Sequence, residues 1–144
     1  MVRTSLFVIA VILFVAGPAE ARNTEHLFNV KDAVEHGTGN ANLKDIPYYF
    51  AGQTHPAVAK KIGTWTSNRS SRGVFRSDEA SCQVAFLSAL IRLQERAASE
   101  GGDAIVDIVS VTRDSRSSSA TQYRCLAGAI VVHVALEGTV VKLK

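Results

Sequence analysis

Residues 77–102 read SDEASCQVAFLSALIRLQERAASEGG, and this stretch decides the fold. Its apolar side chains recur every three or four residues, the period of one face of an α-helix. Ser77 or Asp78 is a suitable N-terminal cap. Gly101 or Gly102 should end the helix with a positive φ. The stretch predicts one amphipathic helix of about six turns. Its apolar stripe comprises Cys82, Ala85, Phe86, Ala89, Leu90, Leu93 and Ala97, and its solvated face comprises Arg92, Gln94, Glu95 and Arg96.

The chain after this helix has the composition of β-strands. Residues 104–112 are β-branched and apolar, 113–120 form a serine-rich turn, and 122–143 are strand-forming with interruptions at Gly128 and Gly138. Both alternating faces of 129–136 are largely apolar, which predicts a central strand covered on both sides. The smaller face surrounds His133 and needs cover from 48–50 or from a neighbouring subunit. The bulkier set, expected to face the helix, comprises Ile130, Val132, Val134 and Leu136.

The chain before this helix gives weaker local signals. Residues 31–36 could form one or two helical turns, with Asn29 as the cap and Gly37 as the end. The aromatic run 46–50 predicts a short strand, with a proline at its start where a missing N–H is tolerated. Residues 58–66 predict a second strand that leads into a turn over 67–73.

The first 21 residues have the pattern of a secretory signal. Arg3 supplies the positive charge, residues 6–16 are continuously apolar, and Ala19-Glu20-Ala21 places small residues at the cleavage position. An uncleaved anchor is the alternative, but this apolar run falls short of the ~20 residues that span a bilayer. We therefore expect cleavage after Ala21 and a single domain over 22–144, periplasmic or secreted and without a stable membrane anchor.

The two cysteines, Cys82 and Cys125, are most simply a structural pair. Export to an oxidising compartment and an even cysteine count both favour a disulfide. A reactive thiol is the alternative, but it usually has a C-x-x-C partner or a basic setting that lowers its pKa. The spacing of these two cysteines offers no such motif.

Composition and motifs argue against several classes of function. The 144 residues are 47% apolar with a net charge of +3, which excludes a disordered tail and a protein that coats nucleic acid. The sequence has no phosphate loop, no G-x-S-x-G elbow and no H-E-x-x-H motif. We therefore expect no enzymatic activity, no cofactor, no metal site and no nucleic-acid partner. A weak metal site or an uncharacterised activity around His133 remains the alternative.

Positive charge is uneven along the chain. The stretch 46–77 holds five basic residues and no acidic one. Such a stretch could bind an envelope protein or an anionic surface, whereas the simpler interpretation is a solvated face. The candidate binding residues are Lys60, Lys61, Arg69, Arg72 and Arg76.

Several motifs resemble known bacterial proteins. The segments YYFAGQ (48–53), SDEASC (77–82), GGDAIVDI (101–108), YRC (123–125) and LEGTVVK (136–142) look like a family of small exported proteins of unassigned role, often called excinuclease-like. An excinuclease ATPase needs a phosphate loop and a far longer chain, so that activity is rejected. At the level of fold, 77–142 is similar to YbjQ-like heavy-metal-binding domains and to the Rcs stress-sensor lipoprotein. The chain departs from the sensor in lacking a lipid-attachment cysteine.

The resemblance implies an α+β domain with one long helix on an antiparallel sheet, and in the YbjQ-like case a homo-oligomer. From these observations we expect a small exported protein of the bacterial envelope that acts by binding or assembly. An envelope stress-sensing or interaction module acting through the 46–77 stretch is a second interpretation.

Overall fold

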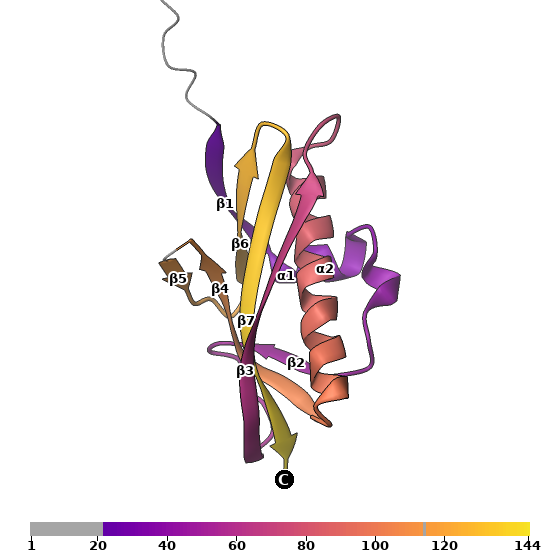
Figure 1. Ribbon diagram of the computed structural model, residues 1–144, viewed down its shortest axis with the longest axis vertical. Helices are drawn as coiled ribbons and strands as arrows, with labels where there is room; N and C mark the ends of the chain where they lie inside the picture. Colours follow the sequence, from indigo (N-terminus) through magenta and orange to yellow (C-terminus); the bar gives the residue numbers. More distant parts are fainter. Residues whose placement is uncertain (1–21, 114) are drawn as a thin grey trace, which may run out of the picture.

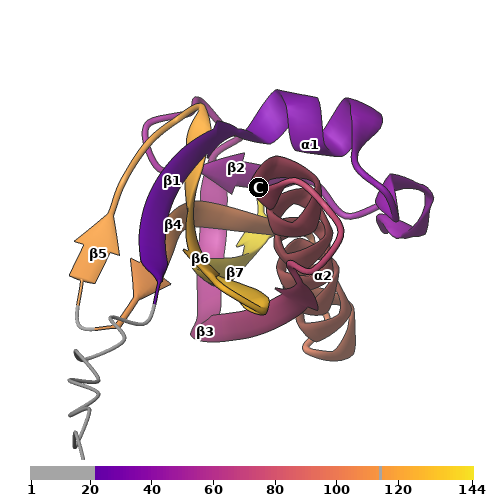
Figure 2. The same ribbon diagram turned by 90° about the horizontal axis from the view of Figure 1, so that it is seen from above.

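A curled sheet of seven strands wraps around a long helix, as Figure 1 and Figure 2 show. The computed structural model describes residues 22–113 and 115–144, so the predicted signal peptide 1–21 lies outside the described residues. The fold is α+β. In chain order the elements are β1 (Asn23–Asn29), α1 (Val30–His36), a 3₁₀ turn (Asn40–Asn42), β2 (Tyr48–Phe50), β3 (Val58–Arg72), α2 (Asp78–Ser99), β4 (Ala104–Thr112), β5 (Ser115–Ser117), β6 (Gln122–Gly128) and β7 (Val131–Leu143).

Helix α2 confirms the prediction for 77–102. The Ser77 side chain accepts a hydrogen bond from the Ala80 N–H at 3.1 Å, and Gly101 takes a φ of +71°. Every residue of the predicted apolar stripe is buried. Gln94 was expected on the solvated face, and that was wrong. Its side chain is buried and hydrogen-bonds the backbone of Lys44 and Ile46 at 2.8–2.9 Å, which fastens the 43–47 segment to the helix.

Strand β7 organises the sheet. It pairs with β3 along one edge, and with β6 and then β4 along the other. Strand β1 extends the sheet beyond β6, and β2 extends it beyond β4. The β2–β4 pair is parallel, and α1 is a second helix, so the expectation of one long helix on a purely antiparallel sheet holds only in part. The helix predicted over 31–36 is confirmed, with Gly37 following its last residue.

Strand β3 is longer than predicted. It continues through 67–72, where a turn was expected, because β7 supplies a continuous antiparallel partner for this polar segment. Ser67, Arg69 and Ser71 are buried or half-buried, and the intervening residues are exposed. This alternation of buried and exposed residues is that of a strand and not of a loop.

Three further differences have clear physical causes. Strand β1 was not predicted because its residues are polar, yet it pairs with β6 along its whole length. The serine-rich turn contains β5, which pairs back onto β4. Gly138 does not interrupt β7. A Cβ there would lie 2.6 Å from Ile105 Cγ2, so this glycine allows close packing within the continuing strand.

The two faces of β7 differ in their cover. Val132, Val134 and Leu136 are buried in the core beneath α2, as predicted, whereas Ile130 is 65% exposed because it lies in the β6–β7 turn. Phe50 packs in that same core. Tyr49, Val58 and Leu143 cover Ala104, Val106 and Val141, which form a small second cluster. Of the two covers expected for the His133 face, cover by 48–50 is wrong, because His133 is exposed; cover by a neighbouring subunit stays a prediction.

Candidate functional site

The outer edge of β3 is the longest unpaired backbone edge of the sheet. Within the described residues, β7 is the only strand that pairs with this 15-residue strand. The Gly73 N–H donates to the Ile130 carbonyl at 2.8 Å, and the β3–β7 register stays in step back to Thr64. In an antiparallel ladder, alternate residues direct their N–H and C=O groups away from the partner. This register directs the backbone groups of Thr66, Asn68 and Ser70 outward.

A groove of about 550 Å³ runs between this edge and helix α2. Trp65 lines the groove and is half-buried, and the Arg96 guanidinium lies 5.6 Å from the centre of the Trp65 ring. The groove thus combines an unpaired strand edge, an aromatic ring and charged side chains. Its lining comprises residues 65–69 of β3 and Arg92, Leu93, Glu95, Arg96 and Ser99 of α2.

The charge of the groove is positive. Arg92 pairs with Glu95 at 2.6 Å, and Arg96 reaches Glu100 at 3.1 Å. Among the described residues no carboxylate lies within 4.0 Å of Arg69, so its charge is available to a ligand. Three arginines and one glutamate line the groove, which favours an acidic ligand.

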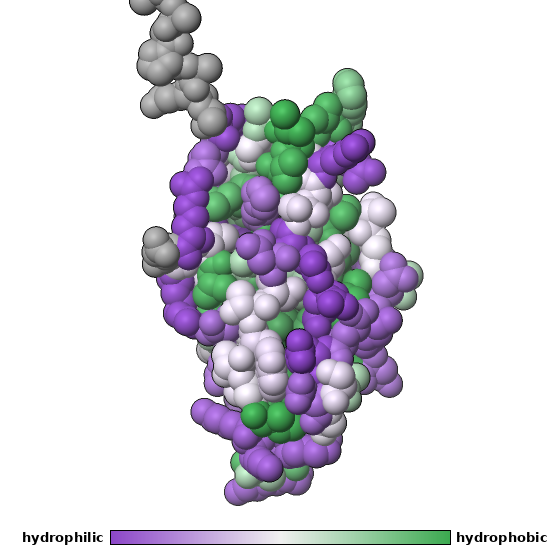
Figure 3. Space-filling model, viewed as in Figure 1, coloured by the Kyte–Doolittle hydropathy of each residue, from purple (hydrophilic) through white to green (hydrophobic). Residues whose placement is uncertain are grey.

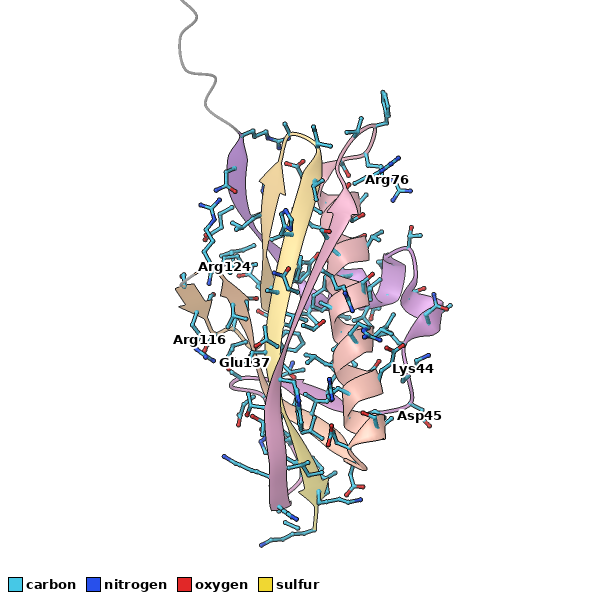
Figure 4. The ribbon with its side chains drawn as sticks, viewed as in Figure 1. Lys44, Asp45, Arg76, Arg116, Arg124 and Glu137 are labelled. Atoms are coloured by element: carbon cyan, nitrogen blue, oxygen red, sulfur yellow. A yellow bond between two sulfur atoms is a disulfide. The ribbon has the colours of Figure 1, made fainter. Side chains whose placement is uncertain are left out.

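The structure spreads the five basic residues of the 46–77 stretch along the molecule. Lys60 and Lys61 lie at one end of β3 and Arg72 at the other, a separation of roughly 40 Å at the rise of an extended strand. Arg76 lies beyond Arg72, in the loop that leads to α2 (Figure 4). Of the five, only Arg69 lines the groove.

His133 lies on the sheet face opposite α2. It lines a depression of about 250 Å³ together with Asn23, Asn68 and Arg113, and none of the described residues that line it is a carboxylate. No group of three His, Cys, Asp or Glu side chains suited to a metal ion occurs in the described residues. The depression therefore gives His133 amide and guanidinium neighbours.

An adjoining depression of about 490 Å³ contains an ion pair. Arg116 points toward Glu137 (Figure 4) and donates to its carboxylate, which also accepts from Thr66. The bond from Arg116 is the main cause that lowers the pKa of Glu137 below its usual range. Glu137 is therefore a charged and already partnered carboxylate.

The two cysteines do not belong to the groove. Cys82 of α2 and Cys125 of β6 form a disulfide with their Cα atoms 5.9 Å apart, and both are fully buried. The predicted pairing is confirmed, and the bond fastens the helix to the sheet. A disulfide of this kind is typical of an oxidising, extracytoplasmic compartment. No helix among the described residues is both long and apolar enough to cross a membrane.

Sequence reasoning missed the groove because its two walls are far apart in the chain. One signal was present: the helix residues Arg92 and Arg96 are one turn apart and share a face with Ser99. Their meeting with Trp65 depends on the extension of β3 through 67–72.

Comparisons of the chain with protein-family models, curated proteins and solved structures find no match.

Proposed function

We propose that this protein is an exported, non-enzymatic binding protein of the bacterial envelope, which takes an extended acidic segment of another protein along the outer edge of β3. The observation that carries the proposal is the long edge strand with an open groove beside it. An extended peptide can add to such an edge through main-chain hydrogen bonds, while pockets beside the edge select its side chains.

Natural sheets usually protect long edges with bulges, lysines or covering elements. Within 22–113 and 115–144, the β3 edge is protected in this way only near Lys60 and Lys61, where the pairing with β7 is irregular. From Thr64 to Arg72 the register is regular and the outward side chains are small or polar. This half of β3 is therefore the part suited to accept a partner strand.

The positive charge of β3 favours an acidic segment, and not a second copy of β3, as the strand that adds to this edge. Strand β3 contains four basic residues and no acidic one, so two copies paired side by side would gain no opposite-charge pair. An acidic segment would place carboxylates near Arg69, Arg92 and Arg96. These arginines present donors in the planar arrangement that suits carboxylates.

The test uses a fluorescent peptide in which Thr and Glu alternate, titrated with the purified protein and followed by anisotropy. The matched comparison is Asn68→Pro against Asn68→Ala. Proline removes an outward N–H without removing a bond to β7, whereas alanine keeps that N–H. We expect Asn68→Pro to weaken binding about tenfold and Asn68→Ala to leave it near the parent value.

A second peptide, with Thr and Lys alternating, tests the charge argument and should bind much more weakly. Equal binding of the two peptides would contradict the acidic preference. Equal affinity of the Asn68→Pro and Asn68→Ala variants, both shown to be folded by their thermal unfolding, would contradict strand addition at β3.

A further inference from the structure

An exposed apolar tip lies at the end of the molecule where β3 leads into α2. The tip consists of the loop 72–76 and the neighbouring β6–β7 turn at Ala129 and Ile130, which are joined by the bond from Gly73 N–H to the Ile130 carbonyl. Phe75 is fully exposed, Ile130 is 65% exposed and Val74 is 39% exposed. Figure 3 shows hydrophobic residues gathered at this end of the molecule, while hydrophilic residues cover much of the remaining surface.

The backbone holds Phe75 outward in an unfavourable conformation. Its φ is +63°, a value that bulky side chains rarely adopt and that favours glycine or asparagine. A large aromatic side chain that is both fully exposed and held in this region stabilises neither the core nor the turn. Such a residue is retained at sites of function more readily than for folding.

Positive charge flanks the apolar tip. Arg72 precedes the exposed residues and Arg76 follows them, and neither lies within 4.0 Å of a carboxylate among the described residues. The nearby Asp78 carboxylate is already bonded by Arg22 and His26. The tip therefore presents apolar side chains between two free guanidinium groups.

We infer that this tip inserts into the interfacial region of a bilayer rich in phosphatidylglycerol, independently of the groove beside β3. Apolar and aromatic side chains bury into the headgroup boundary, and flanking arginines are attracted to anionic lipid. A protein partner is less suited to this shape, because a stable protein interface buries far more surface than three protruding side chains provide. The tip thus gives reversible surface attachment.

The test is co-sedimentation with vesicles of equal parts phosphatidylcholine and phosphatidylglycerol, compared with pure phosphatidylcholine. The decisive variant is Phe75→Gly, which suits the positive φ and so should not unfold the protein. We expect this variant to partition about tenfold more weakly into the anionic vesicles. Arg72→Ser and Arg76→Ser should each weaken partitioning about fivefold and reduce its dependence on salt.

Leu27→Ala is the matched control, because Leu27 of β1 is 53% exposed but lies outside the tip. Parent and variants are purified in the same way, so any contribution of residues 1–21 is common to all of them. A second readout uses the double variant Trp65→Phe/Phe75→Trp, which places the single tryptophan at the tip. The fluorescence emission of this tryptophan should shift to the blue when anionic vesicles are added. Unchanged partitioning of Phe75→Gly, an equal loss in Leu27→Ala, or no blue shift would each overturn the inference.

Discussion

Gly101 is favoured by its backbone conformation, whereas Gly138 is favoured by close packing against Ile105. A Cβ at Gly101 would meet no heavy atom within 4 Å, so only the φ of +71° opposes a side chain there. We expect Gly101→Val to lower the free energy of unfolding by about 1–2 kcal/mol, because the left-handed region is unfavourable for a β-branched residue. Gly101→Asn should cost less, since asparagine tolerates that region. Urea unfolding measures both, and equal stabilities of the Val and Asn variants would contradict this account.

Asp103 ties the C-terminal end of β7 to the start of β4. Its carboxylate accepts from the Leu143 N–H at 3.0 Å and from the Lys142 ammonium at 3.1 Å, and these bonds, the first above all, lower the pKa of Asp103. A carboxyl with a lowered folded pKa stabilises the fold above its unfolded pKa, and this contribution is lost as pH falls through the folded pKa. We therefore expect Asp103→Asn to lose less stability than the parent between about pH 5 and pH 2. If the free energies of unfolding of Asp103→Asn and of the parent, measured by urea unfolding, fell equally with pH over this range, the expectation would be ruled out.

At the scale of elements, the disulfide joins α2 to β6 across a sequence separation of 43 residues. Closing a loop of this length lowers the entropy of the unfolded chain, and the chain-entropy model gives about 4 kcal/mol. The Cys82→Ala/Cys125→Ala variant should lose stability of this order, measured by urea unfolding. Mass spectrometry of the unreduced parent should show two hydrogens fewer than the dithiol. A double variant as stable as the parent would mean that the bond adds nothing to the fold.

Elements with strong local periodicity could be predicted, and elements defined by their partners could not. The stripe of α2 is readable from Phe86, Leu90 and Leu93 alone, because helical spacing repeats within the segment. Strand β3 beyond Ser67 is polar and serine-rich, so its extension depends on pairing with a long β7. For the same reason the groove could not be foreseen: Arg69 was a candidate from its charge, but its neighbour Trp65 was not.

At the scale of the whole molecule, the two proposed surfaces meet only at Arg72, the last residue of β3 and the first of the tip. The groove uses the middle of β3 and the C-terminal half of α2, and the tip uses the loops where β3 and β6 end. Phe75→Gly should therefore leave peptide affinity unchanged, and Asn68→Pro should leave vesicle partitioning unchanged. Both proposals can then fail separately. A loss of both activities in one variant would indicate unfolding and not the loss of a site.

The oligomeric state follows from what the sheet leaves uncovered. On the face opposite α2 the apolar end is already covered by Tyr49, Val58 and Leu143, and around His133 the open surface carries polar groups such as Asn68 and Arg113. Strand β3 carries four basic residues and no acidic one, so two copies paired along this edge would repel each other most strongly at low salt. Neither surface requires a second copy, and we expect static light scattering at low salt to give the mass of one chain. A stable multiple of that mass would instead point to assembly through the His133 face, and replacing His133 with aspartate should then dissociate it.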